Sequence, residues 1–183
     1  PVHLVEDGGA QHRSEHRAVN PMRQVPVLLE DGVPLAQSMA ILEYIEERHP
    51  SPPLLPSDPV ARARVRQLAE VINSGIQPLQ NLRTMQRLRN DFGLSAEQAR
   101  AWCRGWIEEG FEAVNALVGM HGGAFCVGDE VSFADLCLVP QLYNARRFAV
   151  ALEPYPGLTA IEARLQRLPA FVQAHPQVQP DAV

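Results

Sequence analysis

Gln37-Ser38 is a candidate anion site, because it lies where an apolar run gives way to a helical pattern. Ser38 is a plausible N-cap for that helix. The N–H groups in the first turn of a helix lack intrahelical partners and can bind a carboxylate or a phosphate. Simple capping by Ser38 explains the same pattern, so the sequence leaves both interpretations open.

Val25-Pro26 begins another apolar run and is a candidate for binding an extended peptide. A proline at the start of a strand can hold a cis peptide bond, which is uncommon in folded proteins. The Val25 backbone would then be free to pair with a peptide ligand, as in strand addition.

Two segments with a helical pattern contain amide and arginine side chains that could also contribute to a binding site. Residues 76–83 place several amides and Arg83 around Pro78, which distorts a helix. Such a segment can line a site, although Gln and Asn are also ordinary on exposed helical faces. Arg146 and Arg147 lie near the end of another helical pattern. There they either complement the helix dipole or clamp a substrate carboxylate.

Composition narrows the possible functions. The 183 residues carry a net charge of -5 without a long block of like charge, which argues against a nucleic-acid-binding surface. No apolar run approaches the ~18 residues of a membrane span. The three cysteines form no C-x-x-C pair, and the six histidines are scattered, so we expect no metal site and a reducing cytosol. Cys126 stands in an apolar context typical of an inert, buried thiol.

The first part of the chain has β-like texture. Val2–Val5 alternates weakly and suggests a strand, and residues 10–19 suggest a short polar helix. Asp31-Gly32 between two apolar runs predicts a β-hairpin. A helix should follow from Ser38 and end at His49-Pro50.

The remainder is helical in pattern and follows residues 50–57, a proline-rich connector. Asp58-Pro59 predicts the first helix start, and Ser95 and Ser132 each begin a capping box. Gly75 and Pro78 should bend the first long helix, Trp102 and Trp106 should face a core, and the last helices should cover about 157–168 and 169–175. We therefore predict an α+β fold with an N-terminal domain over 1–49, a linker over 50–57 and an all-α domain over 58–183.

Several motifs together resemble the zeta-class glutathione transferases, which include maleylacetoacetate isomerase. They are Asn20-Pro-Met-Arg-Gln-Val-Pro26, Gln37-Ser-Met-Ala-Ile41, Gly75-Ile-Gln-Pro-Leu-Gln-Asn-Leu82, Cys126-Val-Gly-Asp-Glu-Val-Ser-Phe-Ala-Asp135 and Asn144-Ala-Arg-Arg-Phe148, with Gln179-Pro-Asp181 at the close. The capping box belongs to the wider superfamily, whereas the segments 77–82 and 144–148 point to the zeta class.

The resemblance implies a thioredoxin-like N-terminal domain, an all-α C-terminal domain, a cytoplasmic homodimer and glutathione as cofactor. It implies reversible thiolate addition that isomerises maleylacetoacetate to fumarylacetoacetate in tyrosine and phenylalanine breakdown. The family pattern assigns glutathione binding to Gln11, Val25, Gln37, Ser38, Gln77, Asn81 and Arg83. It implies that Arg147 binds a substrate carboxylate, and we expect Arg83 to help position the carboxylates of the diacid.

The family's catalytic serine motif precedes the segment that matches Pro1, so we assign no catalytic residue. Ser14 stands in the wrong context to replace that serine. We expect a first strand and helix of the thioredoxin-like domain to lie upstream, and little isomerase activity from residues 1–183 alone. Maleylpyruvate isomerisation, general transfer to α-halo acids and a non-catalytic glutathione-fold binding module remain alternatives.

Overall fold

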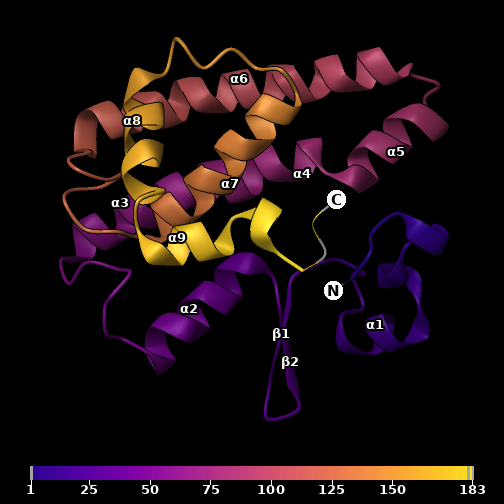
Figure 1. Cartoon of the computed structure of the whole chain (residues 1–183), viewed down its shortest axis with the longest axis horizontal. Helices are drawn as coiled ribbons and strands as arrows, with labels where there is room; N and C mark the ends of the chain where they lie inside the picture. Colours follow the sequence, from indigo (N-terminus) through magenta and orange to yellow (C-terminus); the bar gives the residue numbers. More distant parts are fainter. Residues whose placement is uncertain (1, 181, 183) are drawn as a thin grey trace. The chain divides into compact units, whose positions relative to one another are not determined.

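The computed structural model describes residues 2–180 and 182, in two compact units (Figure 1). One unit extends to Pro52 and takes in Pro180, and the other comprises Pro53–Gln179. The division between them falls inside the proline-rich segment 50–57. Asp181 of the closing motif lies outside the described residues.

The first unit is built around a β-hairpin followed by a helix. Its elements are η1 (Glu6–Gly8), η2 (Ala10–His12), α1 (Ser14–Val19), β1 (Val27–Glu30), β2 (Val33–Ala36) and α2 (Ser38–Arg48). β1 and β2 pair antiparallel, from Val27 opposite Ala36 to Glu30 opposite Val33. Asp31 and Gly32 form the two-residue turn with φ values of 51° and 80°. Positive φ at both positions is what such a turn needs, so the hairpin prediction is confirmed.

The start of this unit differs from the sequence expectation. Val2–Val5 is not a strand, and the sheet formed by the described residues has two strands, β1 and β2. A four-residue alternation is too short to specify a strand without a partner that completes its hydrogen bonds. The chain instead turns through η1, and Gly8 and Gly9 have φ values of 80° and 89°. The expected helix over 10–19 is divided into η2 and α1.

The second unit is all helical. Its elements are α3 (Pro59–Glu70), the π-helical segment η3 (Val71–Ile76), α4 (Gln77–Gln80), α5 (Leu82–Asn90), α6 (Ala96–His121), α7 (Phe133–Arg147), α8 (Pro156–Leu165), α9 (Pro169–Ala174) and η4 (Pro176–Val178). The predicted caps are confirmed: Asp58 accepts a hydrogen bond from the Ala61 N–H at 2.7 Å. Ser95 and Gln98 form the reciprocal capping box. The bend expected near Gly75 and Pro78 is a π-helical segment followed by one short turn of helix.

The core of this unit lies between α3, α6, α7 and α8 (Figure 1). On α6 the fully buried stripe is Cys103, Ile107, Phe111 and Val114, at helical spacing. The expectation that Trp102 faces this core is wrong, because Trp102 is 38% exposed. Its neighbour Cys103 occupies the core-facing position, and Trp102 lies on the adjacent helix face. None of the described helices is both long and apolar enough to cross a bilayer.

Candidate functional site

The turn before β1 is held by side chains, which leaves the Val25 backbone unengaged. The buried Asn20 amide donates to the Gln24 carbonyl at 2.8 Å and accepts from the Met22 N–H at 3.0 Å. The His16 ring also contacts the Gln24 carbonyl, at 2.9 Å. The Val25–Pro26 bond is cis, as the sequence suggested. Within the described residues, the Val25 N–H and carbonyl make no hydrogen bond, so both can pair with a ligand.

The start of α2 is the second unsatisfied backbone site. Gln37 is the N-cap, no side chain caps the helix, and the first intrahelical bond runs from the Ile41 N–H to the Gln37 carbonyl. Ser38 is therefore the first helical residue, and its predicted capping role is wrong. Gln37 has φ 77°, a conformation that non-glycine residues adopt at a cost of about 1–3 kcal/mol, often at ligand sites. Free first-turn N–H groups suit a carboxylate.

The hairpin register brings these two sites to one place. Val25 precedes Val27 by two residues, and Ser38 follows Ala36 by two residues. Because Val27 and Ala36 are paired, Val25 and Ser38 both lie at the open end of the hairpin, away from the Asp31-Gly32 turn. A ligand there can meet a strand-like backbone edge and a helix N-terminus at once.

Gln11 adds a buried acceptor to the same unit. It is 7% exposed, and its amide nitrogen donates to the Leu4 carbonyl at 3.0 Å. Its Oε1 atom has no hydrogen-bond partner among the described residues. Burying an unpaired carbonyl oxygen is unfavourable by about 1–3 kcal/mol, so a ligand N–H would be favoured there.

In the helical unit, the predicted residues fall on the elbow between α4 and α5, residues 77–84. Asn81 interrupts the helix with ψ 164°, and its Oδ1 accepts from the Thr84 N–H at 3.0 Å. Gln77 and Arg83 are exposed. Arg83 makes no ion pair with any other described residue, so its guanidinium is available to an anion.

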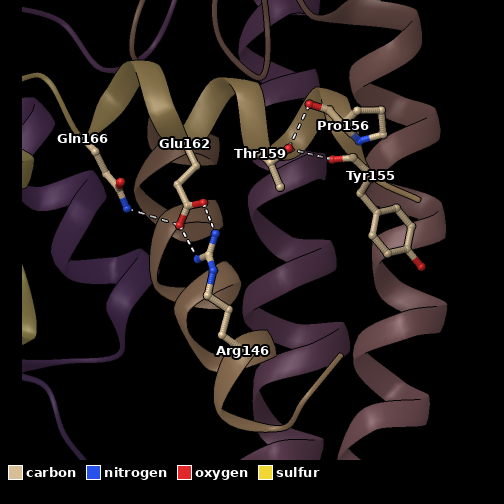
Figure 2. A network of polar contacts seen from close by, with 6 residues as sticks. All are labelled: Arg146, Tyr155, Pro156, Thr159, Glu162 and Gln166. Carbon is tan, nitrogen blue, oxygen red and sulfur yellow. Dashed lines mark hydrogen bonds and ion pairs between the residues drawn. The ribbon is translucent and has the colours of Figure 1, made fainter. Parts of the chain in front are cut away.

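The two arginines at the end of α7 differ in their contacts. Arg146 donates two hydrogen bonds to Glu162 on α8, at 2.6 and 2.5 Å. Figure 2 shows the two side chains pointing toward each other. Glu162 is 4% exposed, and its hydrogen bonds raise the pKa of the Arg146 guanidinium. Arg147 is exposed and contacts only Asn144, at 3.2 Å, among the described residues. Arg146 therefore joins two helices, whereas Arg147 is free to bind a carboxylate.

The cysteines have inert surroundings. Burial raises the pKa of the Cys126 thiol, and it raises that of Cys137 to about 12. Such thiols are protonated and unreactive near neutral pH. The described residues also contain no group of three His, Cys, Asp or Glu side chains that could hold a metal ion.

The sequence did not reveal two contacts that hold the elbow. Gln80 and Gln141, both 3% exposed, form a reciprocal amide pair with distances of 2.5 and 3.3 Å. The Trp102 indole N–H donates to the Leu79 carbonyl at 2.9 Å. These partners lie 61 and 23 residues apart, and no local pattern signals such pairing.

Comparison with known proteins agrees with this architecture. The glutathione S-transferase N-terminal domain family matches residues 2–47, and the glutathione S-transferase C-terminal domain family matches residues 88–173. The chain is 49% identical to the probable maleylacetoacetate isomerase 2 of Drosophila melanogaster, over 99% of this chain and 77% of that protein. It is 46% identical to the maleylacetoacetate isomerase of Mus musculus, over 99% and 81%. The chain belongs to the zeta-class glutathione S-transferases.

Solved structures of the family have the same fold. A bacterial zeta-class maleyl pyruvate isomerase in its holo form superimposes with a TM-score of 0.92 at 41% identity, over 95% of this chain and 83% of that one. The maleylacetoacetate isomerase of Anaeromyxobacter dehalogenans with glutathione bound has a TM-score of 0.84 at 50% identity, over 92% and 79%. The predicted glutathione transferase fold is thereby confirmed.

Proposed function

We propose that this zeta-class protein isomerises maleylacetoacetate to fumarylacetoacetate with glutathione as cofactor. The observation that carries the proposal is the open end of the hairpin, where the Val25 backbone and the uncapped start of α2 lie together. Glutathione presents a peptide backbone to the first and a γ-glutamyl carboxylate to the second. Relatives that share up to half of the sequence carry this activity in their names.

The residues of the first unit fit that ligand. Val25 would pair its N–H and carbonyl with the cysteinyl residue. Gln37 and Ser38 would hold the γ-glutamyl carboxylate with first-turn N–H groups. Gln11 would accept a ligand N–H at its unpaired Oε1.

Glutathione bound at this site would supply a thiolate for reversible addition to the alkene, which would lower the order of the double bond and so allow its rotation. The chain's own task is then to hold the diacid and to stabilise negative charge that develops next to its carbonyl. Arg83 and Arg147 carry guanidinium groups without an ion-pair partner among the described residues. We assign the substrate carboxylates to these two residues, and we propose that Gln77 and Asn81 also contact glutathione.

Maleylpyruvate is the second candidate substrate, favoured by the similarity to a maleyl pyruvate isomerase. It offers the same maleyl group and differs only beyond the carbonyl. We further propose that the protein is cytoplasmic and acts as a homodimer, as the family pattern implies. Gel filtration with light scattering tests the dimer.

The decisive assay offers the full-length protein both maleyl acids and an α-halo acid, with either glutathione or S-methylglutathione. We expect maleyl isomerisation with glutathione and no turnover with S-methylglutathione alone, which keeps the γ-glutamyl group but has no free thiol. Added to the glutathione reaction, S-methylglutathione should inhibit it. Turnover of the halo acid without maleyl isomerisation would favour a general transferase. Glutathione binding without turnover of any of these substrates would favour a binding module.

A further inference from the structure

At the α4–α5 elbow, side chains donate hydrogen bonds to the last carbonyls of α4. α4 is four residues long, and Asn81 interrupts the helix immediately after it. The last carbonyls of a helix have no intrahelical donor and need other partners. The Thr84 hydroxyl donates to the Pro78 carbonyl at 2.6 Å. The Trp102 indole N–H donates to the Leu79 carbonyl at 2.9 Å.

Trp102 reaches the elbow from α6, which packs against both α4 and α5. Its ring also lies edge-on to Trp106, with ring centroids 5.8 Å apart and an interplanar angle of 61°. This geometry restricts the indole orientation. The buried stripe of α6 consists of other residues, so Trp102 contributes little to the core.

Trp102 therefore makes a side-chain hydrogen bond from α6 to the break before α5. Leu79 precedes Asn81 by two residues and Arg83 by four. A shift of the Leu79 carbonyl would move the start of α5 and with it the Arg83 guanidinium. An error of about 1 Å in a positioning group is enough to weaken binding or catalysis substantially.

We propose that Trp102 is a positioning residue, whose indole N–H fixes the α4–α5 elbow and so sets the enzyme's affinity for the diacid substrate. The inference rests on the proposed function, because it takes the elbow to carry the substrate-binding Arg83. Trp102 itself touches no substrate and acts through Leu79.

The test compares Trp102→Phe with Trp106→Phe in the full-length enzyme. Trp102→Phe keeps an aromatic ring and loses the N–H donor, whereas Trp106 donates no hydrogen bond among the described residues. We expect the KM for the diacid to rise about five-fold in Trp102→Phe, the effect of one lost hydrogen bond, with kcat changed less than two-fold. The Kd for glutathione should change less than the KM, because the proposed Val25 and Ser38 contacts lie outside the elbow. Trp106→Phe should leave KM within two-fold of wild type.

A double variant separates positioning from general destabilisation. If Trp102 acts through Arg83, Arg83→Ala already removes the benefit, and adding Trp102→Phe raises KM no further. Additive effects, or equal effects of the two tryptophan variants, would overturn the inference. If Trp102→Phe folds poorly, Thr84→Val replaces it in the test. This variant removes the neighbouring hydrogen bond to the Pro78 carbonyl and should also raise the KM.

Amide hydrogen exchange tests the contact between Trp102 and the elbow independently of the proposed function. In Trp102→Phe the amides of Thr84 and Met85, which are hydrogen-bonded to Asn81, should exchange faster than in Trp106→Phe, whatever the enzyme's substrate. Faster exchange in a protein without isomerase activity would remove the proposed function and leave the structural link. Unchanged exchange in an active isomerase would remove the link alone.

Discussion

Asp135→Ala is expected to destabilise the helical unit more than any other capping change. The Asp135 side chain is fully buried, and its Oδ1 accepts from the Cys126 N–H at 3.0 Å. Its Oδ2 accepts from the Ser132 N–H at 2.9 Å and from the Ser132 hydroxyl at 2.8 Å. Alanine would leave two backbone N–H groups buried without acceptors, at about 1–3 kcal/mol each. We therefore expect a loss of about 3–5 kcal/mol in the free energy of unfolding, a large part of the 5–15 kcal/mol typical of proteins.

Asp58→Ala is the matched control, because Asp58 caps α3 with a single hydrogen bond at an exposed position. Its loss should be about 1 kcal/mol. Urea unfolding followed by far-UV circular dichroism, at one fixed protein concentration, measures both variants. Asp135→Asn keeps one carbonyl oxygen as an acceptor, so its loss of stability should lie between those of Asp135→Ala and Asp58→Ala. If Asp135→Ala lost no more stability than Asp58→Ala, the role assigned to the buried carboxylate would be refuted.

The surroundings of Gly110, of the two arginines at the end of α7 and of Cys137 also have measurable consequences. Gly110→Ala should lower the free energy of unfolding by about 1–3 kcal/mol in the same assay, because an added Cβ would lie 2.3 Å from side-chain atoms of the buried Ile76. An unchanged free energy of unfolding would contradict the close packing of Gly110 against Ile76. Arg147→Ala should raise the KM for the diacid about ten-fold or more with little change in melting temperature. Arg146→Ala should lower the melting temperature, because it leaves the buried Glu162 carboxylate without its guanidinium partner. Native protein at pH 8 should resist thiol reagents at Cys137, whose pKa is raised to about 12. The folded state holds the Cys137 proton more tightly than the unfolded state does. The contribution of this thiol to stability is therefore complete below the unfolded pKa of about 8.5 and is lost as pH rises toward 12.

Local signals in the sequence predicted much of the fold. Asp31-Gly32 specified the hairpin because both turn residues need positive φ, and Ser95 specified a helix start because its capping box is contained in four residues. The β-like pattern of the first part of the chain, the helical pattern of the remainder and the proline-rich segment between them were also evident from composition over short windows.

Features that depend on distant partners escaped prediction. Val2–Val5 alternates as a strand would, but a strand exists only where a neighbour completes its ladder. Trp102 and Cys103 are adjacent apolar residues on α6, and packing alone decided which of them is buried. For the candidate site, sequence similarity supplied the residues, whereas only the contacts distinguish Arg146, which is paired, from Arg147, which is not.

The most direct test of the glutathione site is an NMR titration of the ¹⁵N-labelled full-length protein with glutathione. We expect saturable binding in which the amide resonances of Val25, Ser38 and Met39 shift together, because those N–H groups gain acceptors at the open end of the hairpin. The Asp31 and Gly32 resonances, at the opposite end, should shift least. Saturable binding that left Val25 and Ser38 unchanged, or no binding at all, would show that glutathione does not bind at the open end of the hairpin.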